Sequence, residues 1–130
     1  MRNLLILVCA LFIAPLFAEE TKNWAQWRGP SGQGHVNDPR VPLEWSESKN
    51  LLWKVKLPGV GHSTPVVWGN KLFLTCATTD GAERWVVCVD IDAGKIAWQK
   101  PVAGGQYVKI HETNTFASPS CATDGKYVFA

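Results

Sequence analysis

The feature that most constrains the fold is a pair of short apolar runs that are hydrophobic on both faces of the strands they would form. In residues 71–78, leucine and cysteine side chains alternate on one face, while Phe73 and Ala77 lie on the other. Residues 84–90 have the same character. A sheet that covers a core on one side and meets water on the other shows polar and apolar residues in alternation. These runs therefore predict a small sheet packed between two apolar neighbours.

Turn signals divide the rest of the chain into further short strands. Gly69-Asn70, Asp80-Gly81 and Ala93-Gly94 are typical of tight turns between antiparallel strands. The strands predicted from apolar patterning are residues 51–57, 64–68, 71–78, 84–90 and 95–102. No segment combines sustained helical periodicity with capping residues. We therefore predict an all-β fold of antiparallel strands.

Two partial copies of one pattern occur along the chain. Trp53 and Trp98 follow similar residues and are 45 positions apart, and Pro65 and Pro119 are 54 positions apart. After each proline come a short apolar run, a turn that contains glycine, a lysine and another apolar run. Repetition with a period of 40 to 50 residues indicates an architecture built from stacked, similar units.

The amino terminus has the pattern of an export signal. One positive charge at Arg2 precedes an uncharged apolar run over residues 4–16, and Ala18 stands just before Glu19. This arrangement predicts a signal peptide over residues 1–18 with cleavage between Ala18 and Glu19. A lipid-modified Cys9 is the alternative, although the bulky Val8 disfavours it. We expect an exported protein, periplasmic or extracellular, with no membrane span after cleavage.

The net charge and the cysteine content limit which partners and which covalent cross-links we expect. The formal net charge is +2 and no long run of like charges occurs, so we do not expect nucleic acid as a partner. After signal cleavage three cysteines remain, and export permits a disulfide. Cys76 and Cys88 could face each other across a hairpin, or all three cysteines could be small buried hydrophobic residues.

The stretch 89–98 carries a family resemblance. Asp90, Gly94, Lys95 and Trp98 match the repeat motif of the quinoprotein, or pyrroloquinoline-quinone-like, β-propellers. Three other stretches resemble exported members of that family, namely residues 24–30, 61–67 and 114–119. Together these motifs extend over nearly all of residues 23–130.

The resemblance implies a β-propeller of four-stranded antiparallel blades. Residues 19–49 would form an N-terminal arm, and residues 50–130 would supply a closing strand, one full blade and the start of the next. Trp53 and Trp98 would be the tryptophans that hold blades together, with stacking on a cofactor as their alternative role. Because a propeller needs at least four blades, we expect this sequence to be the N-terminal part of a longer propeller protein.

Few residues have the spacing of a catalytic or metal site. The three histidines lack a metal-binding spacing, and Ser63 and Ser118 lack the Gly-x-Ser-x-Gly context of a nucleophile. Asp80 and Asp92 are interpreted as turn formers. The histidines are His35, His62 and His111.

An aromatic cluster near the mature N-terminus has two interpretations. Trp24, Trp27 and Arg28 could form a clamp with the cation on a ring face. They could instead anchor the N-terminal arm to the rest of the fold, which is the interpretation we favour.

Two functions are consistent with these observations. The first is a non-enzymatic scaffold that binds other envelope or extracellular proteins, as the propeller of the bacterial outer-membrane barrel assembly machinery does, and needs no cofactor. The second is a dehydrogenase that oxidises alcohols or sugars with pyrroloquinoline quinone and calcium. We favour the scaffold by analogy of fold.

Overall fold

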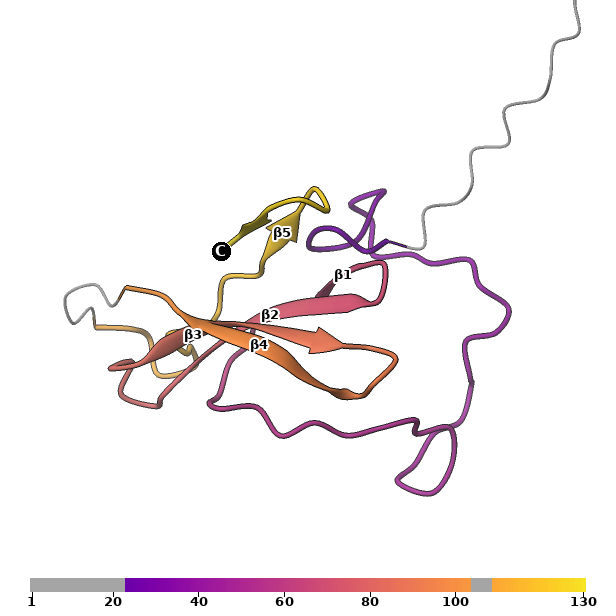
Figure 1. Ribbon diagram of the computed structural model, residues 1–130, viewed down its shortest axis with the longest axis horizontal. Coiled ribbons are helices and arrows are strands. Elements are labelled where there is room, and N and C mark those ends of the chain that lie inside the picture. The colour runs from indigo at the N-terminus through magenta and orange to yellow at the C-terminus, as the bar shows by residue number, and fades with distance from the viewer. Residues whose placement is uncertain (1–22, 104–108) are drawn as a thin grey trace, which may run out of the picture.

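A four-stranded antiparallel sheet in the order β1-β2-β3-β4 is the centre of the computed structural model (Figure 1). The structure describes residues 23–103 and 109–130, so the predicted signal peptide and its cleavage site lie outside the described residues. The strands of this sheet are β1 (Val66–Trp68), β2 (Lys71–Ala77), β3 (Arg84–Asp90) and β4 (Lys95–Pro101). Two further strands, β5 (Ala122–Thr123) and β6 (Val128–Phe129), form a separate antiparallel hairpin.

The all-β prediction is confirmed for the described residues, which contain no helix. Four of the five predicted strands are present with boundaries that differ by two residues at most. The β2–β3 hairpin has an unbroken register from Lys71 opposite Asp90 to Ala77 opposite Arg84. Its turn uses Gly81 at a φ of 70°, a conformation that glycine adopts without steric cost.

The central sheet is apolar on both faces, as its sequence predicts. One face, which we call the hairpin face, buries Val66, Phe73 and Cys88 together with Cys121 from the segment before β5. The other face, which we call the linker face, is built around four buried residues of the sheet, Leu74, Cys76, Val87 and Val89. Figure 1 shows the sheet between the yellow β5–β6 hairpin and the magenta segment that leads into β1.

A bulge in β4 lets two nearby residues serve opposite faces. Cys88 pairs with Trp98 and Val89 pairs with Ile96, so Ala97 has no partner in the ladder. Residues two apart in a regular strand point to the same side, but the extra residue reverses that relation. Ile96 therefore packs on the linker face and Trp98 on the hairpin face.

The strand predicted over residues 51–57 is absent. This stretch, which we call the linking segment, belongs to no strand of the structure. Trp53, Val55 and Leu57 nevertheless share one side and pack against the linker face, as their alternation predicts. The prediction was wrong because a strand requires a partner backbone, and none lies beside this segment among the described residues.

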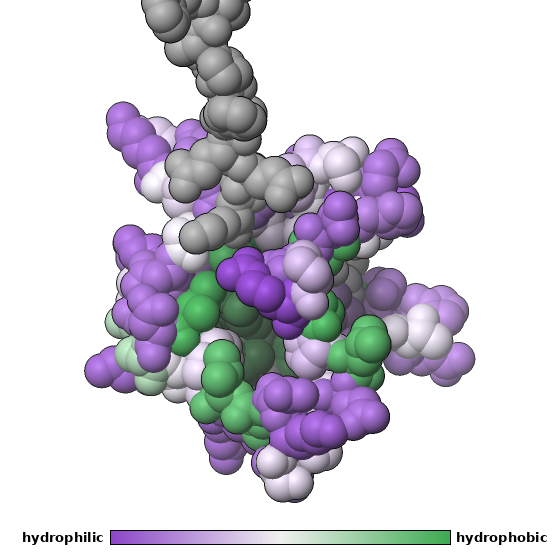
Figure 2. Space-filling model, turned by 90° about the vertical axis from the view of Figure 1, so that its right-hand side faces the viewer, coloured by the Kyte–Doolittle hydropathy of each residue, from purple (hydrophilic) through white to green (hydrophobic). Residues whose placement is uncertain are grey.

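Hydrophobic side chains also remain at the surface. Figure 2 shows green side chains gathered around a hollow on one side of the molecule. The exposed large hydrophobic residues of the arm and linking segment are Trp27, Val36, Val41, Leu43, Trp45, Leu51 and Leu52. Leu43 and Leu52 are more than nine-tenths exposed.

Candidate functional site

The start of the described chain lies between two hairpins, β1–β2 and β5–β6, and is hydrogen-bonded to both. The backbone of Trp24 exchanges two hydrogen bonds with that of Val67 in β1, of 2.8 and 2.7 Å. One residue later, Ala25 O accepts a 2.9 Å hydrogen bond from Thr123 N in β5. Because the same two residues contact both β1 and β5, this part of the arm joins the hairpins and positions the next residues of the chain.

The stretches that lead into β1 and β5 are also bonded to each other. Ala117 O accepts hydrogen bonds from His62 N (3.1 Å) and Ser63 N (3.0 Å). Thr64 N donates to Ser120 Oγ at 2.8 Å. The two copies of the proline repeat found in the sequence therefore lie side by side, although they are more than 50 residues apart in the chain.

Ser63 completes the joint between these elements. Its hydroxyl donates to Thr75 O (3.1 Å) and accepts from Thr75 N (3.0 Å), so it takes the place of a backbone partner for β2. Thr75 Oγ1 in turn donates to Pro119 O at 2.9 Å. The structure thus places Ser63 as a bridging residue between the entrance to β1 and strand β2, a role that no motif in the sequence around it indicates.

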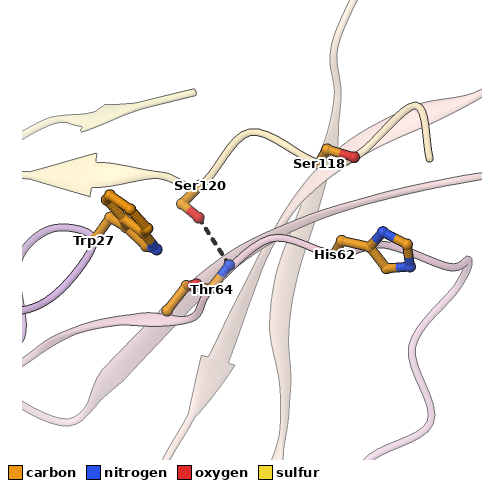
Figure 3. Close-up of a pocket in the computed structure, with 5 residues that line it drawn as sticks. All are labelled: Trp27, His62, Thr64, Ser118 and Ser120. Atoms are coloured by element: carbon orange, nitrogen blue, oxygen red, sulfur yellow. Dashed lines mark hydrogen bonds between the residues drawn. The ribbon is translucent and has the colours of Figure 1, made fainter. Parts of the chain in front are cut away.

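A shallow cleft opens at this joint (Figure 3). Its volume is about 430 Å³, and it is lined by Trp27 of the arm, His62 and Thr64 before β1, and Ser118 and Ser120 before β5. Three stretches that are distant in the sequence therefore meet here. The described residues of the lining combine one indole ring with an imidazole and three hydroxyl groups, and none of them is a carboxylate, lysine or arginine.

The aromatic cluster at the start of the arm contains both a contact between a cation and a ring, as in the clamp interpretation, and an anchor for the arm. The guanidinium carbon of Arg28 lies 4.2 Å from the centre of the Trp27 ring, a cation–π contact. Trp24 instead anchors the arm, and its ring packs on Gly29, where a Cβ would lie 2.7 Å from the indole. Gly29 has a φ of 72°, so glycine is suited to this position on both grounds. The clamp and the anchor are thus neighbouring parts of one turn.

The repeat motif surrounds the turn between β3 and β4. Asp90 Oδ1 accepts a hydrogen bond from Ala93 N at 2.9 Å, and Gly94 N donates to Asp90 O at 2.9 Å. The indole of Trp53 lies against Gly94, and its Nε1 donates to Ile91 O at 2.8 Å. Asp90 therefore shapes the turn, and Trp53 secures the linking segment to it.

Trp98 lies on the opposite side of the sheet from Trp53. Its ring centre is 5.9 Å from that of Phe73, and the ammonium nitrogen of Lys100 is 5.5 Å from the Trp98 ring. Both contacts belong to the hairpin face or its edge, where β6 also packs through Val128. Lys95 is exposed at the start of β4.

The remaining candidates are not brought together. His35, His62 and His111 are all exposed, and only His62 lines the cleft. Ser118 donates its hydroxyl to Thr115 O at 2.9 Å. Across the described ranges, no group of three or more His, Cys, Asp or Glu residues could hold a metal ion.

Two aspartates in turns, Asp80 and Asp124, have lowered pKa values. The hydroxyl of Thr78 donates to Asp80 and lowers the pKa of that carboxyl, with a further contribution from Ala82 N. Backbone hydrogen bonds from Tyr127 and Lys126 similarly lower the pKa of Asp124. Both carboxylates therefore stabilise turns, and the turn interpretation of Asp80 agrees with its contacts. Asp92 is exposed in the next turn.

The sheet geometry rules out a disulfide between Cys76 and Cys88, which was one of the two alternatives that the sequence left open. Cys76 lies on the linker face and Cys88 on the hairpin face, so the backbone of the sheet separates their side chains. All three described cysteines are free and buried. Burial raises the pKa of each thiol, and that of Cys121 rises to about 11. These cysteines fill the core as thiols, which was the second of the two predicted alternatives.

Comparisons with protein-family models, curated proteins and solved structures found no match to this chain. Within residues 23–103 and 109–130, no helix is long and apolar enough to cross a membrane.

Proposed function

We propose that this chain forms part of a β-propeller with pyrroloquinoline-quinone-like repeats, which acts outside the cytoplasm as a non-enzymatic binding scaffold. The observation that supports the proposal is the central sheet, which is apolar on both faces and covered on one by Cys121 and Val128 and on the other by the linking segment. Blades of a propeller have this environment, because each one packs between two others around a central axis.

The relation between repeats supports the same architecture. Trp53 projects from the linking segment onto the sheet β1–β4, and Trp98 projects from β4 onto the side where β5 and β6 lie. The linking segment therefore packs on the central sheet in the same way that β4 packs on the β5–β6 hairpin. That hairpin also repeats the order of β1 and β2, with a glycine turn in each.

Aromatic contacts on turn glycines join the same units. The Trp53 ring covers Gly94, and the Trp68 ring at the end of β1 covers Gly125 in the β5–β6 turn. Both glycines have positive φ, at 60° and 88°. A ring can lie flat on such a turn because no Cβ intervenes, and this favours close packing of successive units.

The proposal assigns the linking segment to the outer edge of a further blade. Its backbone has no hydrogen-bond partner among the described residues, so in this proposal it becomes a strand only by pairing with a part of the protein outside them. Since a propeller needs at least four blades, the remaining blades must come from outside the described residues. A structure of the intact protein with four or more blades around one axis would bear out this assignment, and an isolated two-layer sandwich would contradict it.

The scaffold function rests on the analogy of fold. In this proposal the loops and exposed blade edges bind other envelope or extracellular proteins, and no cofactor is required. The export step has its own test. N-terminal sequencing of the protein recovered from outside the cytoplasm should begin at Glu19, and an uncleaved cytoplasmic protein would contradict export.

A cofactor assay separates the scaffold from the dehydrogenase alternative. The intact protein is incubated with pyrroloquinoline quinone and calcium, freed of unbound quinone, and assayed for dye-linked oxidation of ethanol and glucose. We expect no quinone absorbance to be retained and no turnover. Retained quinone together with turnover would overturn the scaffold proposal and establish the dehydrogenase.

A further inference from the structure

We propose that the cleft at the joint of the two hairpins binds a neutral carbohydrate, with a sugar ring packed on the indole of Trp27. This inference concerns the cleft alone and does not require the propeller. In the described structure an exposed aromatic ring and several uncommitted polar groups line this one cleft, with Trp27 beside Ser120 and Thr64 and with His62 farther along it (Figure 3).

The cleft is held in shape before any ligand arrives. Its three segments are tied by backbone hydrogen bonds, from Trp24 to Val67, from Thr123 to Ala25 and from His62 to Ala117. The hydrogen bond from Thr64 N to Ser120 Oγ then sets the distance between its two walls. A preformed site loses less entropy on binding than one that must be ordered by the ligand.

Several polar groups of the lining retain hydrogen-bonding capacity. Ser120 Oγ accepts from Thr64 N, which leaves its own hydroxyl hydrogen available as a donor. The ring nitrogens of His62 and the hydroxyl of Thr64 have no partner within the described part of the chain. These groups can donate and accept hydrogen bonds, which is the complement that sugar hydroxyls require.

Trp27 supplies the apolar part of the site. Trp27 as a whole residue is 57% exposed, and Arg28 lies over its ring without covering it fully. The C–H groups on one side of a sugar ring form an apolar surface that packs on an aromatic face. Among the described residues that line the cleft none is charged, so a neutral ligand fits better than an ionic one. The volume of about 430 Å³ lies in the range of small-molecule sites.

The test is saturation-transfer NMR on the intact protein with three neutral probes: maltose, cellobiose and diacetylchitobiose. We expect at least one of them to receive saturation at a concentration on the order of 10 mM, as for a weak open site. The substitution Trp27→Ala should weaken that binding by about tenfold or more, because it removes the stacking surface. Trp45→Ala is the matched control, since Trp45 is 82% exposed but does not line the cleft, and binding should be unchanged.

A second pair of variants tests the polar side of the site. His62→Ala should weaken binding by about threefold through loss of one hydrogen bond, whereas His35→Ala, in an exposed loop outside the cleft, should have no effect. Unchanged circular dichroism and thermal unfolding would verify that each variant is folded. Neither histidine nor tryptophan at these positions is buried, so the variants are expected to fold.

Three results would overturn the proposal. The first is the absence of saturation transfer to all three disaccharides, and the second is equal binding by the parent and Trp27→Ala. The third is binding of a sulfated disaccharide alone, abolished by Arg28→Ala, which would make the guanidinium the determinant and assign the cleft to anions.

Discussion

Single glycines are decisive at the points where an aromatic ring lies on a turn. Gly94 has a φ of 60°, and a Cβ there would lie 2.6 Å from Cγ of Trp53. Gly69 has nearly the same φ, 58°, but a Cβ at that position would meet no atom within 4 Å. Alanine substitutions at the two positions can therefore be compared: both add backbone strain, but only the one at Gly94 also displaces a packed ring.

We predict that Gly94→Ala destabilises the protein by about 2–4 kcal/mol, the sum of left-handed strain and overpacking against Trp53. Gly69→Ala should cost only about 1–2 kcal/mol, because it carries the strain alone. Urea unfolding followed by tryptophan fluorescence measures both. Equal losses in the two variants would mean that the Trp53 contact contributes nothing to stability.

At the scale of elements, the side chain of Ser63 connects the entrance to β1 with β2 at a point where no backbone hydrogen bond joins them. β1 is only three residues long, and before it the chain pairs with β2 through a single bridge between Val60 and Ala77. Between these points Ser63 Oγ satisfies both backbone groups of Thr75. The irregular entrance to β1 therefore leaves β2 without an unsatisfied backbone group at this position.

Replacing Ser63 by alanine should cost about 1–3 kcal/mol, because the half-buried N–H and C=O of Thr75 would lose their partner. Ser31→Ala is the control. Ser31 Oγ accepts one hydrogen bond from Gln33 N in an exposed loop, so its loss should change the free energy of unfolding by no more than about 0.5 kcal/mol. Amide exchange of Thr75 gives a local readout: it should accelerate in Ser63→Ala and remain slow in Ser31→Ala.

For the whole molecule, the two apolar faces make the core sensitive to alkaline pH through its thiols. Cys88 and Cys121 are buried on the hairpin face and Cys76 on the linker face. Burial disfavours the charged thiolate, so each pKa is higher in the folded chain than in the unfolded one. Unfolding therefore releases protons above the ordinary thiol pKa.

The sign of this linkage gives the pH prediction. A thiol whose pKa is raised on folding contributes its full stability below the unfolded pKa near 9, and that contribution is lost as pH rises towards the folded value. For Cys121, with a pKa of about 11, the loss should develop between pH 9 and 11. Urea midpoints measured across this range should fall, and should fall less steeply in Cys121→Ala. An identical slope in that variant would exclude Cys121 as the source.

Features of the fold that depend on local apolar patterning could be predicted from the sequence, whereas features that depend on strand register could not. Strands β2 and β3 were predictable because Phe73 and Leu74, adjacent in sequence, are both apolar and so require cover on both sides. The orientation of Trp98 was not predictable, since the unpaired Ala97 reverses it and a bulge has no signal in the apolar pattern. The Cys76 and Cys88 alternatives were separated only when the register placed them on opposite faces.

The cleft shows most clearly what tertiary structure adds. Trp27, His62 and Ser118 were each noticed in the sequence, but nothing in their spacing joins them, and Ser120 was not noticed at all. They meet because the arm and the two strand entrances are bonded to one another across the chain. By itself the sequence determined the all-β class, the turns and the two-faced sheet, because periodicity and turn chemistry are local. Only the tertiary structure decided the faces of Trp98 and the cysteines and the assembly of the cleft, because these depend on register and on contacts between distant segments.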